Sequence, residues 1–313
     1  MTLASRFKRL ALPGVAAILL AYVASASLTT PGFFTLGNLQ AILTSTIFVG
    51  MVAVGMTLIM ISGAFVSLAL GTTATAAAML YMAALPLGLP SAIILTLLAA
   101  AVIGMIQGIA IGGWNANSII VTIAVAAVLE GAAVAASKGV TINPVGTDYR
   151  LLNERYWGLP VGFYILVSLA LMAELILRYT RFGRMIYLVG DRRAAARVAA
   201  LPLSAIGAGV FAFASLTAAL AGIFMGSFNH SASLLLSRGT LSYDAIAAVL
   251  IGGAAIGGGR GSVMRSMMGV LVIAVMTDLV LLQGYSVGAQ IAVKGLVMTA
   301  FALAIHMRQA ANT

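Results

Sequence analysis

Cysteine is absent from this 313-residue sequence, and acids and histidines are scarce, with seven Asp and Glu and two His in all. The lack of cysteine excludes disulfides, thiolate metal ligands and a cysteine nucleophile. The scattered acids and two distant histidines cannot form a convincing metal cluster or triad, so no metal, cofactor or catalytic residue is expected. The pattern GxxxxGK[ST] is missing too, so no P-loop holds a nucleotide. These absences argue against an enzyme.

Charged residues are few: they make up 8% of the sequence, whereas 62% is hydrophobic and the mean hydropathy is +1.12. Soluble domains have roughly 45–50% apolar and about 25% charged residues. Because one helical crossing takes about 20 residues, the composition predicts an all-α polytopic membrane protein with about ten transmembrane helices. Loops must then be short, and residues 1–313 are expected to form a single transmembrane domain.

The formal charge of +10 comes from the shortage of acids, since Lys and Arg number only 17, so membrane lipid and not nucleic acid is the expected contact. Apolar windows predict the spans. They lie at residues 10–28, 39–61, 65–84, 91–112, 118–137, 161–179, 204–226, 243–257, 263–283 and 289–307. The span at 10–28 follows a basic stretch, as the apolar part of a signal peptide does, but its length favours a retained transmembrane helix.

Basic residues then give the orientation, because cytoplasmic loops retain Lys and Arg. With an inside start, twelve fall inside, namely Arg6, Lys8, Arg9, Arg178, Arg181, Arg184, Arg192, Arg193, Arg197, Arg260, Arg265 and Arg308. Four fall outside, namely Lys138, Arg150, Arg155 and Arg238, while Lys294 lies within the last span. This bias predicts that both termini and the 180–203 loop are cytoplasmic.

The 180–203 loop has Ala-rich sequence between its arginines, which predicts a short helix ended by Pro202, with Ser204 placed to cap the next span. The arginines can serve topology and anionic lipid. They can equally dock a cytoplasmic partner, for which a short helix in this loop would act as a lever. The residues alone leave both interpretations open.

Charges within the spans need partners, because a lone charge in the membrane is unfavourable. Glu174 and Arg178 are spaced i, i+4 and are expected to pair. Asp244 follows Ser242 near a helix start, where it complements the helix dipole or lies beside a solute path. Asp278 and Lys294 fall at similar depth in successive spans and are expected to neutralise each other. Glu130 has no evident partner.

Glycine is plentiful, with 34 residues, many inside predicted spans. Gly104 and Gly108 have the G-x-x-x-G spacing that lets transmembrane helices approach closely. The glycines from 63 to 71 and from 252 to 261 are concentrated enough to predict broken helices, one in each half of the chain. Broken helices in corresponding halves mark solute pathways in transporters.

Several segments together resemble the ribose-type branch of sugar ABC importer permeases. The most specific run is YDAIAAVLIGG at 243–253, followed by GGRGSV at 258–263 and KGLV at 294–297. TRFGRMIY at 180–187 is the second, and GNL at 37–39 with GMTLIMISG at 55–63 is the third. The order and spacing of these runs agree over most of the chain.

The resemblance implies a bacterial inner-membrane permease that works as two copies, identical or related, with cytoplasmic ABC ATPase subunits and a periplasmic solute-binding protein. It implies that the 180–203 loop couples to the ATPase through Arg181, Gly183, Arg184, Arg192, Arg193 and Arg197. It also implies that Gly252, Gly253, Gly258, Gly259, Arg260 and Gly261 form a structural Gly-rich motif. ATP-driven closure of the motors would then push the loop and switch the direction of access.

The sequence departs from that family at 63–71, where GAFVSLALG stands in place of the usual GGIDLSVG and Ser67 lies nearest the usual Asp. Ala194 and Pro202 also differ from the residues usual in that family. Whether the chain pairs with an identical copy or with a related subunit stays open. Few charges line any predicted span, which favours a neutral, polyhydroxylated solute. Phe65, Ser67, Asn229 and Asp244 are the candidate residues of the translocation path.

Two other classes of function are weighed against an ABC permease. A stand-alone transporter driven by an ion gradient would take up solute without ATP, but its coupling needs intramembrane acids, which are sparse here. A membrane scaffold that transports nothing would tolerate substitutions at both Gly-rich breaks.

Overall fold

The computed structural model describes residues 27–64, 66–144, 148–234 and 240–309, together with the single positions 21, 23 and 25. Its long helices are α2 (Leu36–Ile61), α3 (Ala69–Ala84), α4 (Leu89–Gly112), α5 (Ser118–Ser137), α6 (Val161–Tyr179), α9 (Leu203–Asn229), α11 (Val263–Leu282) and α12 (Val287–Gln309). The shorter elements are η1 (Leu85–Leu87), η2 (Asp148–Asn153), β1 (Arg155–Tyr156), β2 (Leu159–Pro160), α7 (Arg181–Asp191), α8 (Arg193–Val198) and α10 (Thr240–Ile251). The two strands pair antiparallel in a short hairpin.

The predicted all-α polytopic architecture is confirmed. Within the described residues, seven helices are long and apolar enough to cross a membrane, and α10 and the apolar part of α12 are shorter apolar helices. Nine predicted spans coincide with α2 to α6 and α9 to α12, whereas the span at 10–28 falls mainly outside the described residues. The span expected at 65–84 begins only at Ala69, after non-helical residues 66–68, and the one expected at 243–257 ends at Ile251, where the glycine-rich residues 252–257 follow.

The cap expected from Ser204 is wrong. Helix α9 begins at Leu203, directly after Pro202, and no side chain caps it. The proline turns the chain with a fixed φ and starts the helix one residue earlier than expected. Ser204 therefore lies inside the first turn, where its hydroxyl is not in the capping position.

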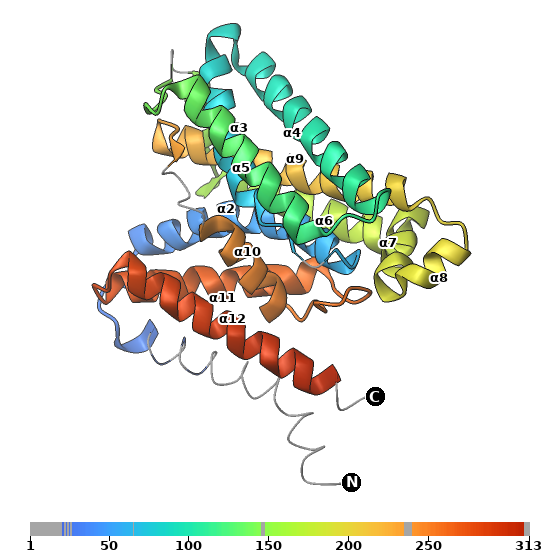
Figure 1. Cartoon of the computed structure of the whole chain (residues 1–313). Coiled ribbons are helices and arrows are strands. Elements are labelled where there is room, and N and C mark those ends of the chain that lie inside the picture. The colour runs from blue at the N-terminus through green and yellow to red at the C-terminus, as the bar shows by residue number, and fades with distance from the viewer. Residues whose placement is uncertain are drawn as a thin grey trace.

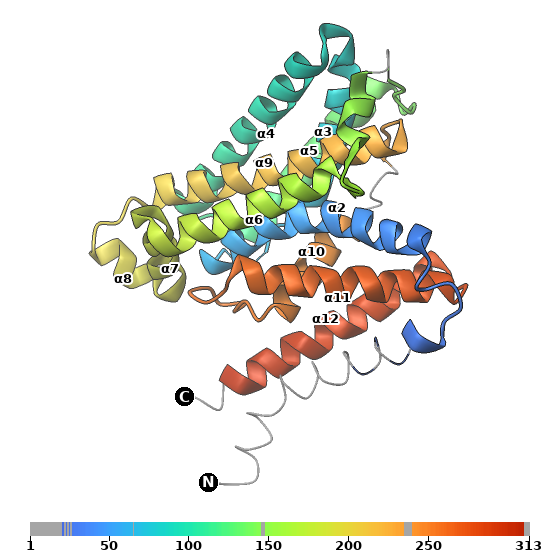
Figure 2. The same cartoon turned by 180° about the vertical axis from the view of Figure 1, so that it is seen from behind.

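Helices α2 and α9 form the centre of the bundle, with α6 beside them (Figures 1 and 2). Every α2 residue from Val49 to Ile61 is buried. Helices α3, α4 and α5 lie on one side of this centre, and α10, α11 and α12 lie on the other (Figure 1). Burial on all sides explains why α2 is apolar around its whole circumference.

The close packing predicted from Gly104 and Gly108 is confirmed. A Cβ atom on Gly104 would overlap the Phe211 carbonyl of α9, and one on Gly108 would overlap the Gly207 carbonyl. Gly112 continues the row against the Leu203 carbonyl. Helices α4 and α9 therefore meet backbone to backbone, as small residues allow.

The two ends of the bundle differ. Helices α7 and α8 lie together at one end, to which the connection between α10 and α11 also extends (Figure 1). Figure 2 shows the same helices from behind, next to the ends of α6 and α9. At the opposite end, η2 and the hairpin meet the end of α9, where the Asn153 side chain donates to the Ser227 carbonyl over 2.7 Å.

Candidate functional site

The first Gly-rich break lies between α2 and α3, where residues 62–64 and 66–68 are non-helical, and neutral hydroxyls hold its backbone. Ser118, at the start of α5, donates to the Ala64 carbonyl and more weakly to the Val66 carbonyl at 3.3 Å. One turn later, the Thr122 hydroxyl accepts from the Leu68 amide over 3.3 Å. Such bonds satisfy backbone groups that no helix satisfies at this point.

Helix α10 holds the same break from the other side. The Ser242 hydroxyl donates to the Leu68 carbonyl over 3.2 Å and accepts from the Gly71 amide over 2.8 Å. A Cβ atom on Gly71 would lie 2.8 Å from that hydroxyl oxygen, so glycine permits the approach. The start of α10, the start of α3 and the first turns of α5 therefore meet at one place.

Ser67 lies in this break with its side chain fully buried. Its hydroxyl has no hydrogen-bond partner among the described residues. A buried, unpaired hydroxyl is unfavourable unless another group comes to it. Ser67 therefore remains a candidate contact for solute, whereas Phe65, the neighbouring candidate, lies outside the described residues.

The second Gly-rich break is the segment 252–262 between α10 and α11. Gly253, Gly258 and Gly259 have φ of +79°, +87° and +71°, a conformation that favours glycine. Backbone bonds fold the segment on itself: the Ala255 amide donates to the Arg260 carbonyl over 2.9 Å. A Cβ atom on Gly252 would lie 2.7 Å from the Arg265 carbonyl, so the end of α10 packs tightly on α11.

The expected pair of Asp278 and Lys294 is wrong. Lys294 Nζ lies 2.7 Å from Oδ1 and 2.9 Å from Oδ2 of Asp244, and both side chains are buried. Asp278 instead accepts from the Asn38 amide group over 2.8 Å. The reason is that α10 packs against α12, so Lys294 turns toward α10 and away from α11.

Asp244 is consequently not the helix-start group that its position after Ser242 suggested. It lies in the second turn of α10, beyond the first turn in which an acid would act as a cap, and its charge is compensated by Lys294. Its neighbour Ser242 contacts the first break at the Leu68 carbonyl. Asn229 is different, because it ends α9 beside η2 and donates to the Met225 carbonyl over 2.8 Å.

The 180–203 segment has an exposed and a buried part. Arg181, Arg184, Arg192 and Arg197 are exposed, and their side chains make no hydrogen bond or ion pair with other described residues. Gly183 is buried, and a Cβ atom there would lie 2.5 Å from Leu177 Cα. Glycine therefore lets the chain turn sharply after α6 and pack α7 against it. Thr180 caps α7 by accepting from the Gly183 amide over 3.0 Å.

Arg193 differs from the other arginines of this segment because it binds the end of α4. Its Nη2 donates to the Ile111 carbonyl over 2.5 Å and to the Gly112 carbonyl over 3.3 Å. Burial lowers the pKa of this guanidinium, and the nearby charge of Arg197 lowers that pKa further. A cation at a helix C-terminus is favourable, and here it attaches α8 to α4.

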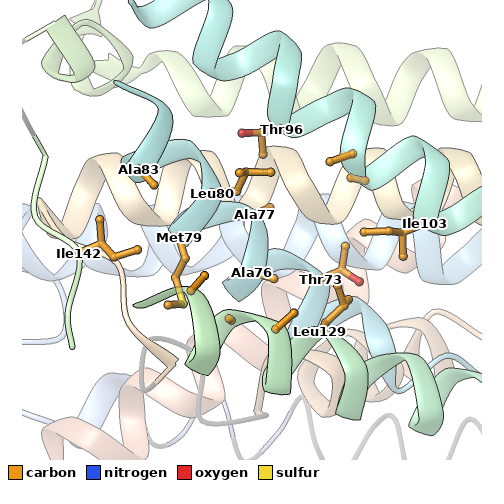
Figure 3. A pocket seen from close by; sticks show the side chains of 15 residues that line it. Thr73, Ala76, Ala77, Met79, Leu80, Ala83, Thr96, Ile103, Leu129 and Ile142 are labelled. Atoms are coloured by element: carbon orange, nitrogen blue, oxygen red, sulfur yellow. The ribbon is translucent and has the colours of Figure 1, made fainter. Parts of the chain in front are cut away.

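A cavity of about 270 Å³ lies between α3, α4 and α5. Figure 3 shows its lining, in which Leu80, Ile103, Leu129 and alanines surround the space and Thr73 and Thr96 are the hydroxyl-bearing side chains. Thr96 donates to its own helix, at the Ala92 carbonyl. A space without charge and with so few polar groups does not suit a polyhydroxylated solute.

Most residues of helix α5 are exposed, and the rest are half-buried except Ser118, Thr122 and Ala133. Ile120 and Val128 on this surface are 67% and 69% exposed. Glu130 is exposed on the same helix, and no hydrogen bond or ion pair to a described residue compensates it. A carboxylate on a spanning helix must reach water or a polar protein group, so Glu130 needs one of these at this face of α5.

Sequence reasoning missed several residues that hold the breaks. Ser118, Thr122 and Ser242 hold the first break, and Glu174 accepts bonds from the second break as well as from Arg178. The expected pairing of Glu174 with Arg178 is confirmed at 2.6 Å. One signal in the sequence could have indicated them: Ser118 and Ser242 are hydroxyl residues close to the starts of their helices.

Known proteins are similar in sequence to most of this chain. The family described as branched-chain amino acid transport system / permease component matches residues 38–305. The ribose import permease protein RbsC of Escherichia coli K12 is 30% identical over 297 residues, covering 93% of this chain and 92% of that protein. RbsC of Bacillus subtilis is 30% identical over 277 residues, with 87% and 85% covered. The L-arabinose ABC transporter permease protein AraH of Azospirillum brasilense is 28% identical, with 85% and 78% covered.

Proposed function

This chain belongs to the family of branched-chain amino acid transport system permease components, and from that premise we propose that it is the membrane-spanning permease of an ABC importer for a sugar-like solute. The first break carries this proposal. Its backbone is held by Ser118, Thr122 and Ser242, and the buried hydroxyl of Ser67 is left unpaired beside them. Neutral hydroxyls and carbonyls are groups that can exchange hydrogen bonds with a sugar.

The likeness to ribose and arabinose permeases supports a monosaccharide as the solute. The residues near the first break support it too, since Asp244 is already compensated by Lys294 and leaves no free charge for an ionic solute. The path would run beside Ser67 and the start of α10. Asn229 is the last residue of α9, at the end of the bundle where η2 and the hairpin lie, and would be at the entrance of the path.

The membrane is the inner membrane of a bacterium, with both termini cytoplasmic. Twelve of the seventeen basic residues then face the cytoplasm, in keeping with the positive-inside rule. This orientation puts α7 and α8 on the cytoplasmic side and the hairpin with η2 on the periplasmic side. Residues 1–313 act as one transmembrane domain, and the family match over 38–305 supports this single unit.

The ATPase docks on α7 and α8, where Arg181, Arg184, Arg192 and Arg197 are exposed and free to bind acidic groups. Gly183 and Arg193 do not face the ATPase. Gly183 lets α7 pack closely against α6, and Arg193 attaches α8 to α4. The ATPase supplies the energy, and a periplasmic solute-binding protein delivers the solute at the hairpin end. The alternative of a stand-alone ion-coupled transporter has no support from the relatives.

A second permease copy, identical or related, completes the site on the exposed face of α5. That face carries Glu130 and large apolar residues, among them Ile120 and Val128. Pairing of two such faces would bury Ile120 and Val128 and leave Glu130 to water or to a polar group of the other copy. The apolar cavity of Figure 3 is separate from this face, because it lies between α5, α3 and α4.

The proposal is tested by reconstituting the permease with its ATPase and binding protein in liposomes and measuring uptake of radiolabelled D-ribose and L-arabinose. Uptake should require ATP and persist when an uncoupler removes the proton gradient. Replacing Arg184 or Arg197 by Ala should reduce uptake at least tenfold while the complex melts at the unchanged temperature, because both side chains are exposed. Unaided uptake by the purified chain, or full solute-stimulated ATPase activity in these variants, would refute the assignment.

A further inference from the structure

Glu174 joins three parts of the molecule at the α7 end of the bundle. It is buried near the end of α6, and its Oε1 accepts from Arg178 Nε over 2.6 Å and from the Ser262 hydroxyl over 3.0 Å. Its Oε2 accepts from the Val263 amide over 2.7 Å and from the Met264 amide over 3.4 Å. The pairing with Arg178 uses only part of this carboxylate.

The bonds to Val263 and Met264 make Glu174 the N-terminal cap of α11. Ser262 occupies the N-cap position of that helix but makes no capping bond with its own side chain. The first amides of a helix need acceptors, and a negative charge is favourable there. A residue 89 positions earlier in the chain therefore performs the capping, and α6 is attached to the start of α11.

A second attachment lies close by, where three backbones meet without side chains between them. The Gly259 amide donates to the Ile61 carbonyl at the end of α2 over 2.9 Å. A Cβ atom on Gly258 would lie 2.6 Å from Gly63 Cα and 2.7 Å from the Gly190 carbonyl oxygen of α7. We name this meeting of Gly63, Gly190, Gly258 and Gly259 the glycine junction.

Tyr187 adds a third link between the same elements. Its hydroxyl donates to the Gly261 carbonyl over 3.0 Å, so α7 also holds the residue that precedes Ser262. Burial raises the pKa of this phenol, and the negative charge of Glu174 raises it further, while Arg265 and Arg178 lower it. The hydroxyl therefore keeps its proton, and donates, at physiological pH.

Among the described residues, α7 makes a hydrogen bond to the second break, from Tyr187 to the Gly261 carbonyl, whereas Gly63 of the first break only packs against Gly190 at the glycine junction. We propose that Glu174 is a positioning residue for transport: with the glycine junction, it makes α7 and residues 258–264 move as one body when the ATPase acts on α7. The inference rests on the proposed function, because it presumes that an ATPase docks on α7. It adds which part of the permease receives the movement.

The test uses the complete complex, purified in lipid nanodiscs, and hydrogen–deuterium exchange with and without trapping by ATP and vanadate. In the unmodified complex, exchange should change in both 181–191 and 258–264. In Glu174→Gln the change should persist in 181–191 and be lost in 258–264. Parallel liposomes should show D-ribose uptake per ATP hydrolysed lowered by roughly 5- to 150-fold, the usual range of coupling between sites, with ATP hydrolysis per complex retained.

Matched variants separate positioning from mere stability. Arg178→Gln removes one partner of Glu174 and leaves α11 capped, so residues 258–264 should still respond. Gly190→Ala introduces a Cβ atom that would overlap the Ile61 carbonyl oxygen and lie 2.5 Å from the Gly259 nitrogen, so it should open the glycine junction and act like Glu174→Gln, whereas Gly257→Ala meets no atom within 4 Å and should not. If Glu174→Gln does not assemble, Gly190→Ala decides the question by the same two readouts.

The outcomes distinguish this inference from the proposed function. If trapping alters neither segment in the unmodified complex, no ATPase acts on α7 and both proposals fail. If 181–191 responds and 258–264 responds equally in Glu174→Gln and Gly190→Ala, the proposed function stands and the role of Glu174 is overturned.

Discussion

The two Gly-rich breaks of this permease interrupt helices in corresponding halves of the chain but are stabilised by different chemistry. Neutral hydroxyls of α5 and α10 hold the first, and a buried hydroxyl there has no partner. The second folds on its own backbone and is held by a carboxylate and by α7. The comparison teaches that similar glycine patterns can be held by different groups, and under our proposals the first break would contact a neutral solute and the second would connect to the ATPase.

Helix α10 links the breaks, because its start binds the first and its end leads into the second. The largest effect is therefore expected from the ion pair that holds α10 to α12. Lys294→Met should leave the buried carboxylate of Asp244 uncompensated and destabilise the fold by about 3–5 kcal/mol. Thermal unfolding in detergent measures this loss, and Asp244→Asn added to Lys294→Met should recover most of it.

An unchanged melting temperature in Lys294→Met would show that the pair does not hold α10. The difference between the breaks would then have to come from local bonds alone. Arg184→Ala is the control, because it also removes one positive charge. The exposed Arg184 side chain makes no bond with described residues, so this variant should keep the unmodified melting temperature.

A smaller effect is expected at the hydroxyls of the first break. Ser118→Ala and Thr122→Val should each reduce the free energy of unfolding by roughly 1 kcal/mol, because hydrogen bonds between transmembrane helices contribute about that much. The double variant should lose roughly the sum. The same unfolding measurement applies, with Thr96→Val as the matched control, because Thr96 bonds only within its own helix.

Equal melting of the Ser118, Thr122 and Thr96 variants would contradict the idea that hydroxyls from α5 hold this segment. A loss far above 1 kcal/mol would instead indicate that α5 and the segment unfold together. Either result would sharpen how the first break differs from the second.

The smallest effect on stability is expected at Ser67. Its hydroxyl is buried without a described partner, so Ser67→Ala should change the free energy of unfolding by no more than about 0.5 kcal/mol, or raise it slightly. Uptake of D-ribose should nevertheless fall, because the solute would lose a hydrogen-bonding group. Unchanged uptake would move the solute contact away from this residue.

Much of the architecture was predictable from local pattern. Apolar runs located nine helices in the described chain, the G-x-x-x-G spacing located the contact of α4 with α9, and the i, i+4 spacing located the pair of Glu174 and Arg178. Periodicity and spacing act within one helix, so the sequence displays them directly. The glycine concentrations likewise indicated where helices are interrupted.

The composition and order of residues alone determined that this protein lives in a membrane, where its helices run and where they break. Only the tertiary structure decided which charges pair and what holds each break. Asp244 lies 50 positions from Lys294, Asn38 lies 240 from Asp278, and Glu174 lies 89 from Val263. Such partners depend on which helices pack side by side, and packing between distant segments leaves no periodic trace in a single sequence.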